Sequence, residues 1–151
     1  MQLDQKEATL LKDLIGQEKL CVDKYTKHAD CAKDPQLKNL FTQIAGVEQQ
    51  HLNGLQQLSS GSLPSPSGAS QSMPTFSAAY AAENTPEKKH DCFLCSDVLA
   101  TEKHASHLYD TCIFEFKDEA VRTYLNHVQK EEQNHGKMIF DYMQKNSMYS
   151  A

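Results

Sequence analysis

Apolar residues recur at every third or fourth position along two long stretches of the chain, and a segment without any period separates them. The first stretch covers residues 3–58 and the second covers residues 91–146. Spacings of three and four are typical of an amphipathic α-helix that buries one face in a core. The pattern therefore predicts an all-α protein.

Two breaks divide these stretches further. Asp34 is followed by Pro35, which suits a helix start because aspartate caps free amides and proline is tolerated at the first helical position. The second break lies near Lys117 and Asp118. We expect helices over residues 3–31, 35–58, 92–115 and 118–145.

The segment between the two stretches, residues 59–90, is rich in Ser, Pro, Gly and Ala and reads as a flexible connector. It joins one predicted hairpin, residues 1–58, to another, residues 91–146. Two helical hairpins with one long link predict an antiparallel four-helix bundle with a crossover between the second and third helices. At 151 residues the chain is long enough to bury a core, so we expect a single domain over residues 1–151.

The apolar face of the second predicted helix contains two residues that do not belong in a core. In the stretch "GVEQQHLNGL", Glu48 and His51 fall in line with Ile44 before them and Leu55 after them. A buried carboxylate and a buried imidazole need a partner that offsets their lost hydration.

The same polar residues occur in both halves of the chain at a constant offset. Glu18 and Glu48 are equally far from Lys33, so folding the hairpin there brings them level, at a rise of about 1.5 Å per residue. The second hairpin repeats this arrangement around Lys117. Adding 84 to Glu18, Tyr25, Glu48 and His51 gives Glu102, Tyr109, Glu132 and His135.

Four carboxylates that converge in an apolar core must be protonated, paired or neutralised by cations. Two divalent metal ions would balance four negative charges, and a mixed set of oxygen and nitrogen ligands suits iron, or manganese, better than zinc. The alternative is a buried polar network that holds the register of the helices without metal. The expected metal ligands are Glu18, Glu48, His51, Glu102, Glu132 and His135.

Composition and charge limit the classes of partner and the cellular location expected for this protein. The net charge is −5, and no basic patch indicates binding to nucleic acid. No run of about 18 apolar residues predicts a membrane span, and the polar start MQLDQKEATL is not a signal peptide. Five cysteines, an odd number without regular spacing, favour a reducing, cytoplasmic location over a disulfide framework.

The remaining cysteines and histidines carry weaker signals. Cys92 and Cys95 form one Cys-x-x-Cys pair near a predicted helix start, where the helix dipole lowers a thiol pKa, although packing of Cys95 and a surface thiol are the simpler interpretation. Cys21 lies one turn from Glu18, and its role stays open. His28 lies too far along its helix to bind the metals. Three further histidines are expected to face solvent: His104, His107 and His127.

The paired Glu-x6-Tyr and Glu-x-x-His motifs resemble those of the ferritin-like, rubrerythrin-like superfamily over essentially all four predicted helices. The amino-acid sequence between the motifs is most similar to that of the spore coat F family of endospore-forming bacteria. The segments that carry this second resemblance are LLKDLIGQEKLCVDKY, LKNLFTQIAGVEQQHLNGL, CSDVLATEKHASHLYDTCIFEF and YLNHVQKEEQNHGKMIFDYM.

The resemblance implies roles for the repeated residues. Glu18 and Glu102 would be terminal ligands and Glu48 and Glu132 bridging ones, while His51 and His135 would each give one nitrogen per metal. Tyr25 and Tyr109 would donate hydrogen bonds to the ligand carboxylates. Rubrerythrins add a four-cysteine module, which this chain lacks, and a carboxylate at the position of Ala105. That difference argues against a cycle that moves a metal between alternative ligands.

These expectations lead to one functional hypothesis with rivals. The leading hypothesis is a di-iron oxidoreductase that reacts with H2O2 or O2 and takes electrons from an external donor. One rival is a structural spore coat protein, bound to other coat proteins, in which the metal centre mainly stabilises the fold. Others are a ferroxidase or metal-handling protein and a manganese catalase. A location in the mother cell or spore, deposition in the spore coat and a homodimer formed by exchanged hairpins are all compatible with the chain.

Overall fold

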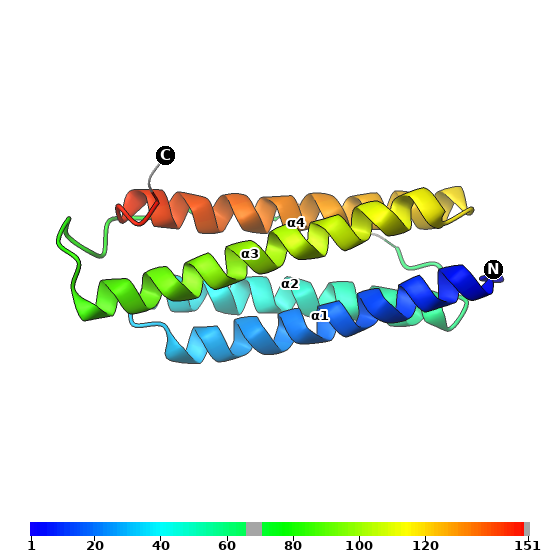
Figure 1. The fold of residues 1–151 in the computed structure, drawn as a ribbon, viewed down its shortest axis with the longest axis horizontal. Helices are drawn as coiled ribbons and strands as arrows, with labels where there is room; N and C mark the ends of the chain where they lie inside the picture. The colour runs from blue at the N-terminus through cyan, green and yellow to red at the C-terminus, as the bar shows by residue number, and fades with distance from the viewer. Residues whose placement is uncertain (66–70, 150–151) are drawn as a thin grey trace.

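The computed structural model describes residues 1–65 and 71–149, which form four α-helices and no β-strand (Figure 1). This confirms the predicted all-α class. The helices are α1 (Gln5–Cys31), α2 (Pro35–Ser59), α3 (Pro86–Glu115) and α4 (Glu119–Lys145).

Each helix begins directly after a residue whose side chain accepts a hydrogen bond from the first turn. Asp4 forms a capping box with Glu7 at the start of α1. Thr85 caps α3 and is followed by Pro86, so α3 begins there and not near residue 92. The Ser, Pro and Ala content of the preceding residues hid this start. The other two capping residues are Asp34 and Asp118.

The helices form two hairpins that lie side by side. Within each hairpin the two helices run in opposite directions, whereas α2 and α3 run in the same direction (Figure 1). The link between α2 and α3 therefore returns along the length of the molecule, as the predicted crossover requires.

Two apolar clusters fill the interior, one toward each end of the helices. One cluster includes Phe41 and Ile139, and the other includes Leu11 and Leu125. On every helix the repeated glutamates and histidines lie in sequence between the residues of the two clusters. The polar residues therefore form a layer across the middle of an apolar interior.

The two hairpins hold each other's turns through a reciprocal pair of contacts. Asp91 on α3 accepts hydrogen bonds from the backbone N–H groups of Lys33 and Asp34, both at 2.9 Å. Glu7 on α1 accepts one from the backbone N–H of Lys117, also at 2.9 Å. Adding 84 to Glu7 and Lys33 gives Asp91 and Lys117, so the offset that relates the polar layer also relates these contacts.

The described part of the connector is fixed along the bundle by several contacts. The ring of Phe76 packs edge-on against Tyr142, with centroids 5.3 Å apart. Asn146 accepts hydrogen bonds from two successive backbone N–H groups, at residues 79 and 80. The side chain of Met73 is exposed. Residues 66–70, which also belong to the predicted connector, lie outside the described residues.

None of the helices in the described ranges is both long enough and apolar enough to cross a membrane.

Candidate metal centre

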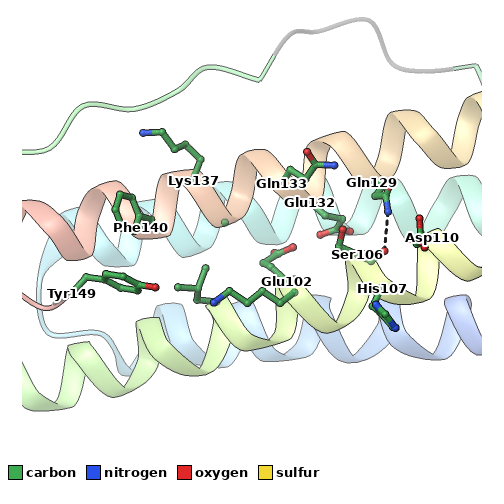
Figure 2. A pocket seen from close by; sticks show the side chains of 13 residues that line it. Glu102, Ser106, His107, Asp110, Gln129, Glu132, Gln133, Lys137, Phe140 and Tyr149 are labelled. Atoms are coloured by element: carbon green, nitrogen blue, oxygen red, sulfur yellow. Dashed lines mark hydrogen bonds between the residues drawn. The ribbon is translucent and has the colours of Figure 1, made fainter. Parts of the chain in front are cut away.

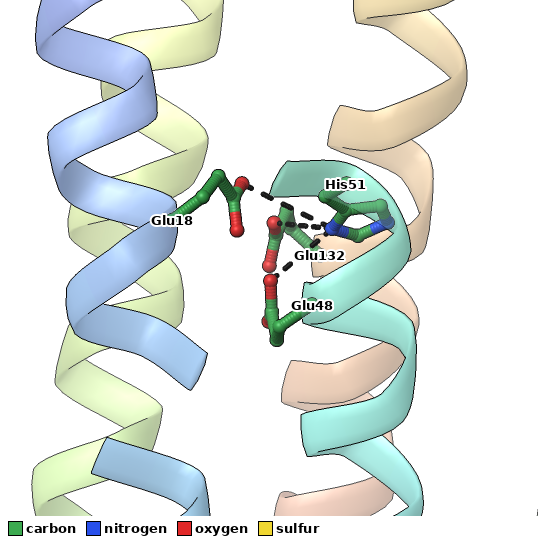
Figure 3. A group of neighbouring side chains, drawn as sticks. All are labelled: Glu18, Glu48, His51 and Glu132. Atoms are coloured by element: carbon green, nitrogen blue, oxygen red, sulfur yellow. Dashed lines mark hydrogen bonds and ion pairs between the residues drawn. The ribbon is translucent and has the colours of Figure 1, made fainter. Parts of the chain in front are cut away.

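The structure brings the six predicted ligands together in one buried layer. They form two groups, and within each group the candidate ligand atoms all lie within 4.8 Å of one another. Glu48 and Glu132 belong to both groups. Figure 3 shows the first group, with Glu18 reaching from α1 toward side chains of α2 and α4. The groups are Glu18, Glu48, His51, Glu132 and Glu48, Glu102, Glu132, His135.

Both imidazole rings present the Nδ1 atom to the carboxylates. Nδ1 of His51 lies 3.1 Å from one oxygen each of Glu48 and Glu132. Nδ1 of His135 lies 3.1 Å from the other oxygen of Glu48 and 3.3 Å from Glu102. The two rings stack with centroids 5.9 Å apart. Nδ1 is therefore the atom that each ring offers as a ligand.

Tyr25 and Tyr109 form reciprocal hydrogen bonds across the pair α1 and α3. Tyr25 donates its hydroxyl to Glu102 at 2.5 Å, and Tyr109 donates its hydroxyl to Glu18 at 2.5 Å. The phenol of each hairpin thus orients the glutamate of the other hairpin. Both rings are fully buried, so the bonds are shielded from water.

Three carboxylate oxygens in this layer are buried without a hydrogen-bond donor among the described residues. They are Oε2 of Glu18, of Glu102 and of Glu132. A buried carboxylate oxygen without a donor requires a proton of its own or a cation. The donor set of four carboxylates and two imidazoles fits two divalent cations of the iron or manganese type, so the residues present match the metals that the resemblance implies.

Without metal, protons neutralise part of this cluster. Burial, followed by the charge of Glu132, raises the pKa of Glu102 to about 8. Burial and the charges of Glu48 and Glu132 also raise the pKa of Glu18 well above its ordinary value. These shifts favour the protonated form of both carboxyl groups in the metal-free protein.

The pKa values of the two histidines are raised, and those of the two shared carboxylates are lowered. Burial acts to lower the pKa of His51 and of His135, but the surrounding carboxylates outweigh it and raise both pKa values well above the usual value. Hydrogen bonds to the histidines lower the pKa of Glu48 and of Glu132 in spite of burial. These shifts favour the charged forms of the two histidines and of the two shared carboxylates in the metal-free cluster.

Two residues that the sequence analysis did not select contact the outer edges of the histidines. Oε2 of Glu131 lies 3.0 Å from Nε2 of His51, and the amide nitrogen of Gln71 lies 2.8 Å from Nε2 of His135. Glu131 has Val47 as its repeat counterpart, so the offset of 84 could not find it. Gln71 lies in the aperiodic connector and has no pattern at all.

His127 corrects one expectation. It is half-buried, and its Nε2 lies 2.6 Å from Oε1 of Glu131, so it does not simply face solvent. The spacing of four residues places His127 and Glu131 on one face of α4. His104 and His107 are exposed, as expected, and His28 pairs with Asp97 at 2.8 Å.

A groove between α3 and α4 leads from the surface to the candidate metal centre. Its volume is about 640 Å³, and Glu102 and Glu132 line it (Figure 2). Lys103 and Lys137 lie along the same groove, and Gly136 is part of its wall. The groove therefore connects the surface to one carboxylate of α3, Glu102, and one of α4, Glu132.

The cysteines are free thiols without a shared site. Because α3 begins at Pro86, Cys92 and Cys95 lie beyond its first turn and not at the helix start. Cys95 is fully buried, and burial followed by the charge of Asp91 raises its pKa. Cys21 is also fully buried, and burial followed by the charges of the glutamates raises its pKa. Both behave as packing residues.

Comparisons with known proteins give one finding. Residues 90–151 match a family model described as Coat F domain, and this range contains α4 and most of α3. No curated protein and no solved structure matches the chain. The matched range includes Glu102, Glu132 and His135, so the half of the layer contributed by the second hairpin lies within it. The match supports a resemblance of this part of the chain to the spore coat F family and suggests a spore coat protein.

Proposed function

We propose that this chain is a ferritin-like four-helix bundle that holds two metal ions, most consistent with iron, and reacts with H2O2 or O2. The observation that carries the proposal is the convergence of six buried ligand residues into two groups that share Glu48 and Glu132. The three buried oxygens without donors support it, because each can accept a metal where it lacks a proton.

Each metal position would use residues of both hairpins. Glu18 and His51 would hold one ion, Glu102 and His135 would hold the other, and the two shared carboxylates would contact both. Two adjacent metal ions of this kind supply the paired electrons that reduction of an oxidant requires, when they are bound. Manganese fits the same donor set.

The protein's own part is to hold the ligands in the correct protonation state. The hydroxyl groups of Tyr25 and Tyr109 fix one oxygen each of Glu102 and Glu18, so their other oxygens stay directed into the centre. Nε2 of His51 lies against Glu131, which favours a proton on that nitrogen and leaves Nδ1 free as a ligand. The apolar clusters shield the layer from water along the bundle axis, and the groove between α3 and α4 connects it to the surface.

The proposal is tested by oxidant consumption. We expect the iron-loaded, reduced protein to consume H2O2 or O2 faster than the same concentration of free iron, with an external reductant sustaining turnover. Replacing Glu18 and Glu102 together by glutamine should abolish this excess rate. Equal consumption by protein-bound and free iron would refute the redox function.

A second candidate is favoured by the Coat F domain match: a structural coat protein in which the metals neutralise the buried charges. In this case a chelator should lower the unfolding temperature strongly, while no oxidant is consumed above the free-metal rate. The two outcomes separate the candidates, because the structural function needs the metal for stability and not for turnover.

A further inference from the structure

The two metal positions are alike inside the layer and different around it. We call the ligands Glu18 and His51 the closed position, and the ligands Glu102 and His135 the groove position. The repeat relates the two sets one to one, because adding 84 to the numbers of the first set gives the second. Any difference between the positions must therefore come from residues that do not repeat.

The first difference is the partner of the outer imidazole nitrogen. At the closed position, Nε2 of His51 faces the Glu131 carboxylate at 3.0 Å, and this carboxylate is itself in contact with His127. At the groove position, Nε2 of His135 faces the Gln71 amide, which carries no charge and whose nitrogen also donates to Glu131 at 3.3 Å. A carboxylate partner makes an imidazole a stronger donor to a metal than a neutral amide does.

The second difference is access from outside. The groove between α3 and α4 is lined by Glu102 and by the shared Glu132, but not by Glu18 or His51. The exposed fraction does not separate the two positions, because Glu102 and His51 are each 3% exposed while Glu18 and His135 are fully buried. Gly136 and Ser106 line the groove, and their repeat counterparts are Leu52 and Val22. Larger apolar side chains thus occupy the matching place in the first hairpin, and Leu52 is buried there.

A smaller cavity of about 180 Å³ touches His51 from the side of α2 and α4. Glu131 and His127 line the same cavity. It reaches the outer edge of the imidazole, on which Glu131 already lies, whereas the glutamate oxygens lie on the Nδ1 side. The contact of this cavity with the closed position is therefore at the outer edge of His51.

We propose that the two positions have different tasks: the closed position binds its metal more tightly, and the groove position binds a small external ligand of the peroxide class. The groove lining carries both signs of charge, with Lys103 and Lys137 beside Asp110, and Lys137 is itself paired with Asp141, so the groove suits a small uncharged polar molecule such as H2O2. This inference rests on the proposed function, because it requires that both positions bind metal.

The access part is tested with azide as the probe ligand on the iron-loaded protein. Gly136→Leu restores the residue of the first hairpin, and its Cβ would lie 3.7 Å from Leu99, an ordinary contact. We expect azide to bind at least about tenfold more slowly, as followed by absorption, with two metals per chain retained. The matched control is Gly46→Leu on α2, where an added Cβ meets nothing within 4 Å.

Ser106→Val gives an independent variant of the same groove wall, should Gly136→Leu not fold. If the folded, metal-loaded variant of either kind binds azide at the rate of the unaltered protein, the groove is not the access route and this part of the inference is wrong.

The affinity part is tested by titrating cobalt(II) alone into the metal-free protein. We expect two unequal binding steps. Glu131→Gln should weaken the tighter step by about 10- to 100-fold and the other step much less, whereas Gln71→Ala, which removes the amide that contacts both His135 and Glu131, should affect mainly the weaker step. Two equal steps in the unaltered protein, or equal effects of Glu131→Gln on both, would overturn the inference while leaving the dinuclear centre intact. Failure to bind two metals would overturn the proposed function itself.

Discussion

At the scale of single residues, the site is governed by one physical problem: four buried carboxylates share one layer of the interior. When metal is absent, bound protons reduce the negative charge of this layer. Burial raises the pKa values of Glu18 and Glu102, which favours their protonated forms, and the surrounding carboxylates raise the pKa values of the two histidines, which favours their cationic forms. Metal ions and protons are therefore competitors for the same oxygen and nitrogen atoms.

This competition predicts opposite pH dependences with and without metal. Burial raises the pKa of Glu102 to about 8, whereas an unfolded glutamate titrates near about 4.3. The folded metal-free protein thus binds more protons than the unfolded chain, and its stability should fall as pH rises from about 6 to about 9. The raised pKa values of His51 and His135 act in the same direction.

Metal binding releases these protons, so the metal affinity should rise over the same pH range. The measurement is the midpoint of guanidinium unfolding at both ends of the range, with and without metal. A metal-free protein that becomes more stable toward alkaline pH would contradict the assigned protonation states.

The reciprocal tyrosine bonds give a second prediction at this scale. Tyr109→Phe removes the hydroxyl that donates to Glu18 and leaves a buried oxygen without that donor. We expect the free energy of unfolding of the metal-free protein to fall by about 1 to 3 kcal/mol, as measured by urea titration. Tyr149→Phe, at an exposed position whose ring contact with Phe140 is kept, should change it little.

At the scale of secondary structure elements, close packing of α2 against α4 depends on one glycine. A Cβ at Gly54 would lie 1.8 Å from the hydroxyl oxygen of Tyr124 on α4, whereas one at Gly46 of the same helix meets nothing within 4 Å. Both glycines lie inside α2, where alanine is the better helix former.

The two glycines therefore predict opposite effects of the same substitution. Gly54→Ala should lower the free energy of unfolding by about 1 to 3 kcal/mol, because the Tyr124 ring must move. Gly46→Ala should raise it by about 0.5 to 1 kcal/mol. Urea unfolding of both variants checks this, and a stabilising Gly54→Ala would show that α2 and α4 are not packed as described.

The contacts between the hairpin turns give a prediction of their own. Asp91 accepts hydrogen bonds from two backbone N–H groups of the first turn and from the hydroxyl of Tyr80, at 2.6 Å. Asp91→Ala leaves these donors without their partner, so we expect a loss of about 2 to 4 kcal/mol in unfolding free energy. Glu119→Ala, an exposed acid at the start of α4, is the control and should change stability by much less. Equal effects of the two substitutions would contradict the contact.

Much of the fold could be predicted from the spacing of apolar residues, because each helix buries one face and therefore has a period. The six converging glutamates and histidines were visible as a repeat on those faces. What has no period stayed hidden: the start of α3 after Thr85, the contact of Gln71 with His135, and the groove. Glu131 was missed because it occurs in only one half. The contact between Glu7 and Lys117 obeys the repeat and could have been found by extending the offset to the helix ends.

At the scale of the whole molecule, the polar layer connects all four helices. Two apolar clusters occupy the ends, and the layer between them is the place where side chains of α1, α2, α3 and α4 meet. If cations occupy it, the centre joins the two hairpins, and removing the metals should weaken the association of the hairpins as a whole. The free energy of unfolding of the bundle then depends directly on how much metal the centre binds.

The measurement that tests this account most directly is the number of metal ions per chain after anaerobic loading with iron(II) and removal of free metal. We expect two ions per chain in the unaltered protein and none retained stoichiometrically when Glu48 and Glu132, the two shared carboxylates, are both replaced by glutamine. The double variant Glu115→Gln and Glu119→Gln, at exposed acids, should retain two. A folded, unaltered protein without stoichiometric metal would show that protons alone neutralise the buried layer, and the dinuclear centre would be refuted.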